Sequence, residues 1–467
     1  MTPAGFAATN PDLTGRSVLV IGLGRSGRAA ARLAASRSAR VTCADSREQL
    51  PREALDLENE GIRVLAGGHP VELLEQTGAE LLVVSPGVPL NIDLIQAAKE
   101  RGLPVWGEIE LAARFTCGRI IGITGSNGKS TVTTMIGNIL RTAGIPGGTG
   151  GNLEVPLAEL LEQDSEAAVH AVELSSFQLE SVEALDPEVA VVVNLTPDHL
   201  DRYASFDDYG RAKARLLEVQ SSARFSILNA DDPESQRFLS SVQGRLHLFS
   251  LESSVAAGAF VRDGMIILRT GYGEEAILEA ERLPLPGPHN LANGLAAALA
   301  CRLAGCDIAS IAQGLLSYRP LAHRLQKVDT VDGIDFYNDS KATNLDAVVQ
   351  AIRSFRTGSV HLILGGKDKG GEWSSLLPLL QERVRSVLLV GQAAGVISRT
   401  LGSSVAHREC VTVQAAVQAG FEDARAGEVV LLSPGCASFD QYTGFEARGD
   451  DFIAAVNGLH RHGGNHA

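Results

Sequence analysis

The chain is organised around the stretch IIGITGSNGKST, which occupies residues 120–131. The run from Ile120 to Thr124 predicts a buried strand, and the glycines that follow predict a turn into a helix beginning near Lys129. Backbone N–H groups of such a turn and helix start bind phosphate oxygens, while the lysine ammonium reaches the β- and γ-phosphates and the next hydroxyl binds Mg²⁺. Position 123 is Ile, so the match is to a shorter Gly-x-x-Gly-Lys-Ser form. A nucleoside triphosphate site is therefore predicted, and a Gly-rich loop without a ligand is the less favoured alternative.

Strands and helices alternate on both sides of this stretch, and 467 residues are about three times the usual ~150 residues per domain. We expect an α/β protein of three domains: an N-terminal Rossmann-like domain (1–108), a central P-loop ATPase-like domain (109–319) and a C-terminal Rossmann-like domain (320–467). The central sheet is expected to be mainly parallel with flanking antiparallel strands, because Asp263-Gly264 interrupts an alternating run as a hairpin turn does.

Charge and cysteine content narrow the class of protein. The net charge of −14 argues against general nucleic-acid or anionic-membrane binding. Six scattered cysteines without a CxxC pair suggest neither a disulfide framework nor a thiolate zinc site. We see no signal peptide and no apolar run long enough to span a membrane, so a cytoplasmic location is expected.

Lysine is scarce, with seven residues against 34 arginines, and this scarcity points to particular loops. Five of the seven fall in glycine- or Ser/Thr-rich segments after expected strands, or in one helix that carries Lys213. A compact ammonium that can lose its proton does what the permanently charged, planar guanidinium cannot. These lysines are therefore candidates for functional roles.

A second glycine turn, Gly22-x-Gly24-x-x-Gly27, follows the first expected strand, and Asp45 ends the next one. Such a turn suits a dinucleotide, another nucleotide diphosphate, or no ligand at all. The segment Ser85-Pro-Gly-Val-Pro89 closes another strand of the same sheet, where ligands of open α/β sheets collect.

Acidic and imidazole side chains follow strands near the phosphate loop. Glu173 ends a strand and is a natural Mg²⁺ ligand beside such a loop, and His199 could hold a second ion. Taken alone, His199 is better explained as a structural histidine and Lys213 as a solvated helix residue. In the third domain, the segments 338–344, 364–370 and 433–438 each follow a strand and form a candidate anion-binding rim for a carboxylate-bearing substrate.

Taken together, five motifs resemble the Mur ligases of peptidoglycan synthesis over nearly the whole chain. They are GSNGKS (125–130), ELSS (173–176), NLTPDHLD (194–201), GPHNLAN (287–293) and DSKATN (339–344). The last motif, with SPGCASFDQ (433–441), is similar to the branch that adds D-glutamate. One departure is Glu154 after Gly150-Gly-Asn152-Leu, where the family pattern continues differently.

The resemblance implies an ATP-dependent ligase that adds D-glutamate to UDP-N-acetylmuramoyl-L-alanine through an acyl phosphate, with ATP and Mg²⁺ as cofactors and a monomeric state. Phosphoryl transfer between anions needs clustered positive charge. The resemblance implies that Lys129 and the bound Mg²⁺ supply this charge, and that Lys129, His199, Lys213 and Glu173 are the catalytic residues. It implies metal ligation by Ser130, Glu173, His199 and Lys213, the last carbamylated and so made anionic.

The resemblance also distributes the substrates. To ATP it assigns Gly125, Ser126, Asn127, Gly128, Lys129, Ser130, Thr131, Asn290, Asn293, Arg324 and Asp339. To the UDP-sugar it assigns Arg25, Ser26, Asp45, Ser46, Ser85, Gly87, Asn152 and His199. To D-glutamate it assigns Thr343, Lys369, Ser438 and Phe445.

Two alternatives stay open at this point. Another ligase of the superfamily, such as a folylpolyglutamate synthase, would differ at residues 339–344. A non-catalytic nucleotide-binding regulator would bind ATP without substrate-dependent turnover.

Overall fold

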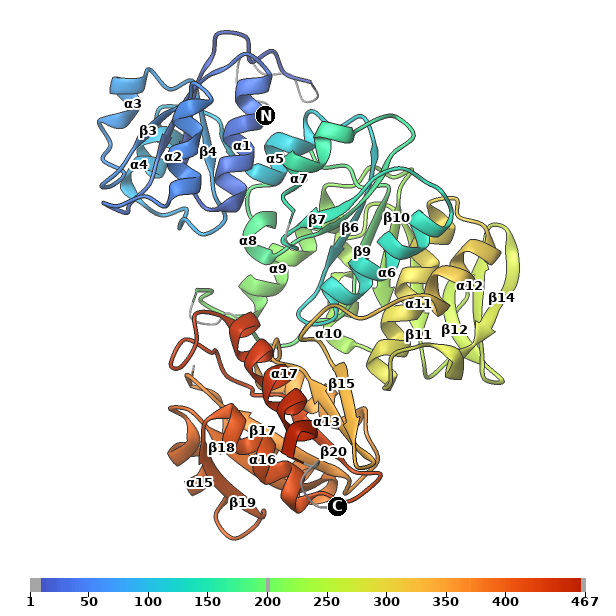
Figure 1. Cartoon of the computed structure of the whole chain (residues 1–467). Helices are drawn as coiled ribbons and strands as arrows, with labels where there is room; N and C mark the ends of the chain where they lie inside the picture. The colour runs from blue at the N-terminus through green and yellow to red at the C-terminus, as the bar shows by residue number, and fades with distance from the viewer. Residues whose placement is uncertain (1–9, 154, 199–201, 369, 463–467) are drawn as a thin grey trace. The chain divides into compact units, whose positions relative to one another are not determined.

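The computed structural model describes residues 10–153, 155–198, 202–368 and 370–462 (Figure 1). The chain forms three sheets in two compact units, one of residues 1–282 and 293–317 and the other of residues 283–292 and 318–467. The predicted three-part α/β class is confirmed. Among the described residues, no helix is both long and apolar enough to cross a membrane, and the six cysteines are free thiols.

The first sheet is parallel, in the order β3-β2-β1-β4-β5. Its strands are β1 Ser17–Ile21, β2 Arg40–Ala44, β3 Arg63–Leu65, β4 Leu81–Val84 and β5 Val105–Gly107. The helices are α1 Arg25–Ser36, α2 Arg52–Asn59, α3 Leu73–Thr77, α4 Asp93–Glu100 and α5 Glu108–Ala113. Alternate β1 side chains enter different cores, because Val18 and Val20 pack on one face while Leu19 and Ile21 pack on the other. The strand order reverses between β1 and β4, which places their carboxyl-end loops side by side.

The central sheet has nine strands in the order β14-β13-β12-β11-β10-β9-β6-β8-β7. They are β6 Arg119–Thr124, β7 Thr149–Gly151, β8 Val169–Glu173, β9 Val189–Val192, β10 Phe225–Asn229, β11 Arg245–Ser250, β12 Gly258–Arg262, β13 Met265–Thr270 and β14 Gly273–Glu279. Pairing is parallel from β7 to β12 and antiparallel from there to β14. Asp263 (φ 51°) and Gly264 (φ 75°) make the β12–β13 turn, as the hairpin signal predicted.

The helices of this region are α6 Lys129–Thr142, α7 Leu157–Leu160, α8 Ser176–Leu179, α9 Phe206–Glu218, α10 Pro233–Gln236, α11 Pro288–Leu303 and α12 Ile308–Leu316, with 3-10 turns Leu161–Gln163, Arg237–Ser241 and Ala280–Arg282. Helix α6 packs on β6 and β8 (Figure 1). Helices α1, α5 and α7 pack on one another, so the first two sheets share one hydrophobic core.

The third sheet has the order β15-β16-β20-β17-β18-β19, with β15 antiparallel to its neighbour. Its strands are β15 Gln326–Val331, β16 Ile334–Asn338, β17 Val360–Gly365, β18 Val384–Val390, β19 His407–Val411 and β20 Val429–Leu432. Its helices are α13 Leu345–Arg353, α14 Leu377–Arg383, α15 Ala394–Leu401, α16 Val413–Asp423 and α17 Phe445–His462, with a 3-10 turn Trp373–Leu376. Leu362 and Leu364 of β17 enter one core and Ile363 the other, so both faces of the sheet are covered.

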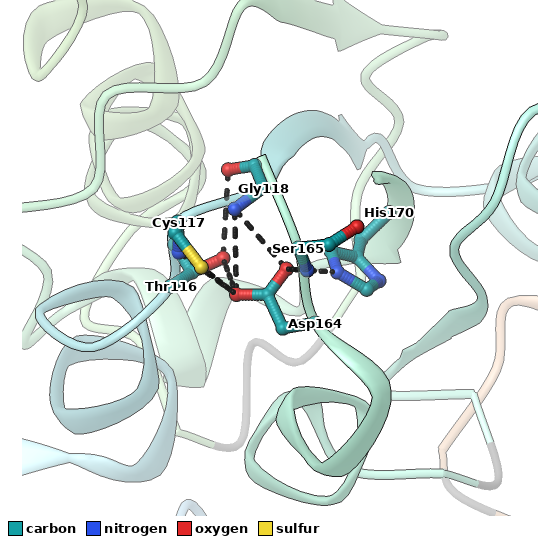
Figure 2. A network of polar contacts seen from close by, with 6 residues as sticks. All are labelled: Thr116, Cys117, Gly118, Asp164, Ser165 and His170. Atoms are coloured by element: carbon teal, nitrogen blue, oxygen red, sulfur yellow. Dashed lines mark hydrogen bonds and ion pairs between the residues drawn. The ribbon is translucent and has the colours of Figure 1, made fainter. Parts of the chain in front are cut away.

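A buried carboxylate ties together the amino ends of β6 and β8 (Figure 2). Asp164 accepts hydrogen bonds from the backbone N–H groups of Cys117 (2.8 Å), Gly118 (3.1 Å) and Ser165 (2.9 Å). It also accepts from the Thr116 hydroxyl at 2.9 Å and lies 3.0 Å from His170 Nε2. Burial would raise the pKa of Asp164, but these donors outweigh it and hold the pKa at about 2. The segment that enters β6 is thereby fixed to the segment that enters β8.

Candidate functional site

The predicted phosphate loop connects β6 to α6, which begins at Lys129 as expected. Gly125 (φ 149°) and Gly128 (φ 80°) adopt conformations that other residues rarely reach. Lys129 Nζ donates to the carbonyl oxygens of Gly125 and Ser126, each at 2.8 Å, so the ammonium lies over the loop. Thr131 lies in the first turn of the same helix.

The segment that follows β9 is hydrogen-bonded to the phosphate loop. Asn127 N donates to Asn194 Oδ1 at 2.9 Å, and Asn194 Nδ2 donates to Asn127 O at 3.1 Å. The Ser126 hydroxyl donates to Thr196 O at 2.8 Å. A Cβ at Gly128 would lie 2.5 Å from Asn293 Oδ1, which places this predicted ATP residue against the loop. Contacts from these side chains hold the phosphate loop.

Glu173 at the end of β8 joins the phosphate loop to β7. Its Oε2 accepts a hydrogen bond from Ser130 Oγ at 2.5 Å, and its Oε1 accepts from Asn152 Nδ2 at 2.7 Å. Asn152 N also donates to Glu173 O at 2.8 Å. Hydroxyl and carboxylate oxygens at one point beside a phosphate loop are the donors that Mg²⁺ prefers, so the residues fit this ion.

Lys213 lies in α9 with its amine buried and only 1% of the residue exposed. Its Nζ donates to Gly125 O at 2.8 Å, the same carbonyl that Lys129 contacts. Burial, followed by the nearby charge of Lys129, lowers the pKa of Lys213 well below the ordinary lysine value. The solvated-helix explanation is wrong for Lys213, because the amine points into the site. Tyr209, one turn earlier, packs its ring 4.7 Å from Nζ.

Five residues named from the sequence remain to be placed. His199 and Lys369 lie outside the described residues, as does Glu154. Asn290 donates from Nδ2 to Pro286 O at 2.7 Å. Asp339 accepts from Leu325 N and the Ser433 hydroxyl; burial, only partly offset by these bonds and by Arg324, raises the pKa of Asp339 to about 7.

The glycine turn of the first sheet is closed by Asp45. Its Oδ2 accepts from Leu23 N at 2.7 Å, and Arg47 donates to both oxygens. The Arg47 hydrogen bond, partly opposed by burial, lowers the pKa of Asp45 below the ordinary aspartate value. Arg25 and Ser26 occupy the first turn of α1, and Ser46 directly follows the carboxylate. The structure thus brings these predicted residues to one sheet edge.

Ser85 and Gly87 lie in the neighbouring loop after β4, in contact with this turn. A Cβ at Gly22 would lie 3.0 Å from Ser85 Cβ. Ser85 also lines a pocket open to solvent, together with Glu108, Phe177, Gln178 and Arg202. The Arg202 guanidinium stacks 3.9 Å from the Phe177 ring. Phe177 and Arg202 were not found from the sequence, because only the fold places them opposite Ser85.

The predicted rim of the third sheet is formed by loops after neighbouring strands β16, β20 and β17. Buried Arg448 donates to Ser340 O at 2.7 Å and Cys436 O at 3.1 Å, and Lys367 N donates to Ala437 O at 2.8 Å. Thr343 and Ser438 belong to the first two of these loops. Phe445 begins α17 with its ring 4.0 Å from Lys341 Nζ. Arg448 was missed because its sequence context is that of an ordinary helix.

The fold and this geometry define a class: a phosphate-loop enzyme whose nucleotide-binding region lies, in sequence order, between two Rossmann-like regions. Comparison with known families matches "Mur ligase MurD-like, N-terminal domain" over residues 16–107, "Mur ligase middle domain" over 123–301 and "Mur ligase, glutamate ligase domain" over 323–436. The chain belongs to the Mur ligase family. It is accordingly an ATP-dependent ligase that forms an amide bond.

Relatives and solved structures agree with this membership. The UDP-N-acetylmuramoylalanine–D-glutamate ligase of Acidobacterium capsulatum is 43% identical over 445 residues, covering 94% of this chain and 96% of the relative. The enzyme of the same name from Koribacter versatilis is 42% identical, covering 95% and 98%. A pseudomurein peptide ligase type C from Methanothermus fervidus (20% identity, TM-score 0.62, 95% and 100% covered) and MurC from Thermotoga maritima (16%, 0.58, 95% and 99%) share the fold.

Proposed function

We propose that this ligase adds D-glutamate to UDP-N-acetylmuramoyl-L-alanine, converting ATP to ADP and phosphate through an acyl phosphate, in peptidoglycan precursor synthesis. The observation that carries the proposal is similarity at 39–43% identity, over 94–96% of the chain, to enzymes named for that reaction. The grouping of Lys129, Ser130, Glu173 and Lys213 at one sheet edge supplies the chemistry that such a reaction needs.

The first half of the reaction activates a carboxylate. An oxygen of the L-alanyl carboxylate attacks the γ-phosphorus of ATP, the bond to the β,γ-bridging oxygen breaks, and ADP leaves. The L-alanyl carboxylate and the phosphates of ATP are all anionic, so positive charge must be concentrated where they meet. Lys129 supplies an ammonium over the phosphate loop, and the loop N–H groups and the α6 N-terminus supply partial positive charge. Mg²⁺, when bound, would screen the phosphate charges, and Ser130 and Glu173 would hold it.

The second half forms the amide. The amine of D-glutamate attacks the acyl carbon, the acyl–phosphate bond breaks, and inorganic phosphate leaves with the amine losing a proton. We assign Thr343, Lys369, Ser438 and Phe445 to D-glutamate, and Asn290, Asn293, Arg324 and Asp339 to the adenosine of ATP. The UDP-sugar is assigned to Arg25, Ser26, Asp45, Ser46, Ser85, Gly87, Asn152 and His199, with Asp45 acting mainly by closing the turn that faces the pyrophosphate.

Lys213 is proposed to be carbamylated and, with His199, to serve a second metal ion. Carbamylation requires a neutral amine to attack CO₂, and the lowered pKa of the buried Lys213 amine favours that form. An arginine at this position would stay charged and could not react.

The remaining assignments are made on the same basis. We place the domain boundaries near residues 108 and 319, and we propose a cytoplasmic monomer. By similarity to the D-glutamate ligases, we propose that the glycine turn of the first domain faces the pyrophosphate of the UDP-sugar and not a nicotinamide dinucleotide.

ADP release with UDP-N-acetylmuramoyl-L-alanine, compared with release with a folate acceptor, tests the proposal. With D-glutamate present, we expect turnover and a product heavier by one glutamyl residue only for the UDP-sugar. Turnover with folate alone would favour the folylpolyglutamate synthase alternative. ATP binding without turnover on either acceptor would favour a regulator and overturn the proposal.

A further inference from the structure

Glu108 is a buried carboxylate that lines the pocket beside Ser85 and to which the proposed reaction assigns no role. It begins α5 directly after β5 and is only 2% exposed. Among the described residues its Oε2 has no hydrogen-bond partner. Burying a carboxyl group costs free energy unless its oxygens are fully bonded, so an apolar side chain would suit mere packing better. The burial raises the pKa of Glu108 to about 7.

The other oxygen of Glu108 caps a helix that lies 50 residues further along the chain. Glu108 Oε1 accepts a hydrogen bond from Ala158 N at 2.7 Å, in the first turn of α7. This helix has Pro156 at its N-cap, which offers no side-chain acceptor. The first N–H groups of a helix need acceptors from outside it, and Glu108 provides one.

Val155, which lies just before α7, contacts the strand that leads to Asn152. Gly151 N donates to Val155 O at 2.7 Å, and a Cβ at Gly150 would lie 2.3 Å from that same oxygen. The position of β7 therefore depends on where α7 begins. The next residue, Asn152, holds Glu173 through its backbone N–H and its side-chain amide.

We propose that Glu108 is a positioning residue: through α7 and the Gly151–Val155 contact it holds Asn152 against Glu173, and so sets the Ser130–Glu173 oxygen pair that would receive the divalent cation. The inference rests on the proposed function for its cation. Groups that orient a metal-binding carboxylate commonly change metal affinity by about 10–100-fold when removed. Glu108 thus connects the last strand of the first sheet to the phosphate-loop site.

The chain offers a matched control on the same helix. Glu110 is fully buried, pairs with Arg114 and accepts hydrogen bonds from the backbone of Glu183 and Ala184. Glu110 also stabilises the local structure, but the hydrogen bonds named here link it to residues 114, 183 and 184 and not to α7. A variant at Glu110 should therefore change stability without changing the affinity for the cation.

The test measures Mn²⁺ affinity by electron paramagnetic resonance in the presence of ADP, with the Mg²⁺ dependence of ADP release and the thermal midpoint measured in parallel. Glu108→Ala and Glu108→Met should weaken Mn²⁺ binding about tenfold. Glu108→Met retains side-chain volume and keeps the test open if the alanine variant does not fold. Glu108→Gln, whose carbonyl can still accept from Ala158 N, should recover most of the affinity.

Glu110→Gln should lower the thermal midpoint and leave Mn²⁺ affinity within about twofold of wild type. Unchanged Mn²⁺ affinity in folded Glu108→Met, or an equal loss in Glu110→Gln, would overturn the role of Glu108. Absence of D-glutamate-dependent turnover in the wild-type enzyme would instead count against the proposed function, since the Mn²⁺ measurement does not depend on it.

Discussion

Each end of strand β8 has a buried carboxylate, and the two carboxylates differ in the kind of groups that donate hydrogen bonds to them. At the amino end, His170 contacts Asp164, whose two oxygens are surrounded by backbone N–H donors from Cys117, Gly118 and Ser165. At the carboxyl end, Glu173 contacts a hydroxyl and an amide that belong to loops expected to bind ligands. Hydrogen bonds hold the polar groups at both ends, and the carboxyl end carries Glu173, which we propose to help bind the cation.

The difference follows from what surrounds each buried group. Asp164 has so many donors that its charge is stabilised and its pKa lies at about 2. Lys213, near the other end, loses water and faces another lysine, so its charge is destabilised. A carboxylate with a full set of hydrogen-bond donors stabilises the fold. An ionisable group whose charged form is disfavoured is available for chemistry. The following variants test that distinction.

Lys129→Ala should have the largest effect. Removing the ammonium over the phosphate loop leaves the developing phosphoryl charge uncompensated, and substrate-dependent ADP release should fall about 10³-fold. Steady-state kinetics would measure the loss. Lys99→Ala, at an exposed position of α4, is the control and should retain full activity. Near-wild-type ADP release by Lys129→Ala would show that the phosphate-loop assignment is wrong.

Lys213→Ala should lower turnover about 10²-fold or more, because the proposed anionic carbamate is lost. Small carboxylates such as acetate should partly restore activity by occupying the vacated space with an anion. Lys213→Arg should stay inactive without rescue, since a guanidinium remains cationic. Full activity of the alanine variant in the absence of added carboxylate would remove Lys213 from the site.

Asp164→Asn should affect the fold but not the chemistry. In this variant the amide NH₂ group would face backbone N–H groups that now donate to Asp164, so that donors would oppose donors. We expect the free energy of unfolding to fall by about 2–4 kcal/mol. Urea denaturation would measure this change, with kcat determined on the folded protein as the companion measurement. A tenfold or greater loss of kcat at unchanged stability would contradict the claim that the amino end of β8 serves the fold and not the chemistry.

Acid should weaken the same contact in the wild-type protein. The folded-state pKa of Asp164, about 2, lies below the ordinary value of 3.8, so its contribution is present above about pH 4 and is lost as the pH falls toward 2. The lost contribution is about 2 kcal/mol, and Asp164→Asn should lack this part of the acid dependence. Parallel pH slopes for the two proteins between pH 4 and 2 would contradict the assigned pKa.

Much of the fold could be predicted from sequence because its central strands are short apolar runs followed by distinctive turns. Strand β6 contains the predicted run Ile120–Thr124, β8 ends at Glu173 as expected, and α6 begins at Lys129. Edge strands such as β7 and β19 were not predicted. β7 is a three-residue Thr-Gly-Gly segment, and β19 exposes most of its side chains, so neither shows the periodicity of a buried strand.

The site was predictable where its residues lie within one motif and less so where they meet only in space. The phosphate loop and Glu173 could be recognised locally. The Lys213 helix showed only a lysine among arginines, and burial beside Gly125 gives that choice its reason. Arg448 and Phe177 gave no local signal, because their roles depend on loops brought together from distant parts of the chain.

ADP release measured with D-glutamate and with L-glutamate, at saturating ATP and UDP-N-acetylmuramoyl-L-alanine, tests the central claim most directly. If the chain is the D-glutamate-adding ligase, D-glutamate should support turnover and product formation while L-glutamate gives release at the level seen without an amino acid. Equal turnover with both enantiomers, or preference for L-glutamate, would contradict that function even if the phosphate-loop chemistry is correct.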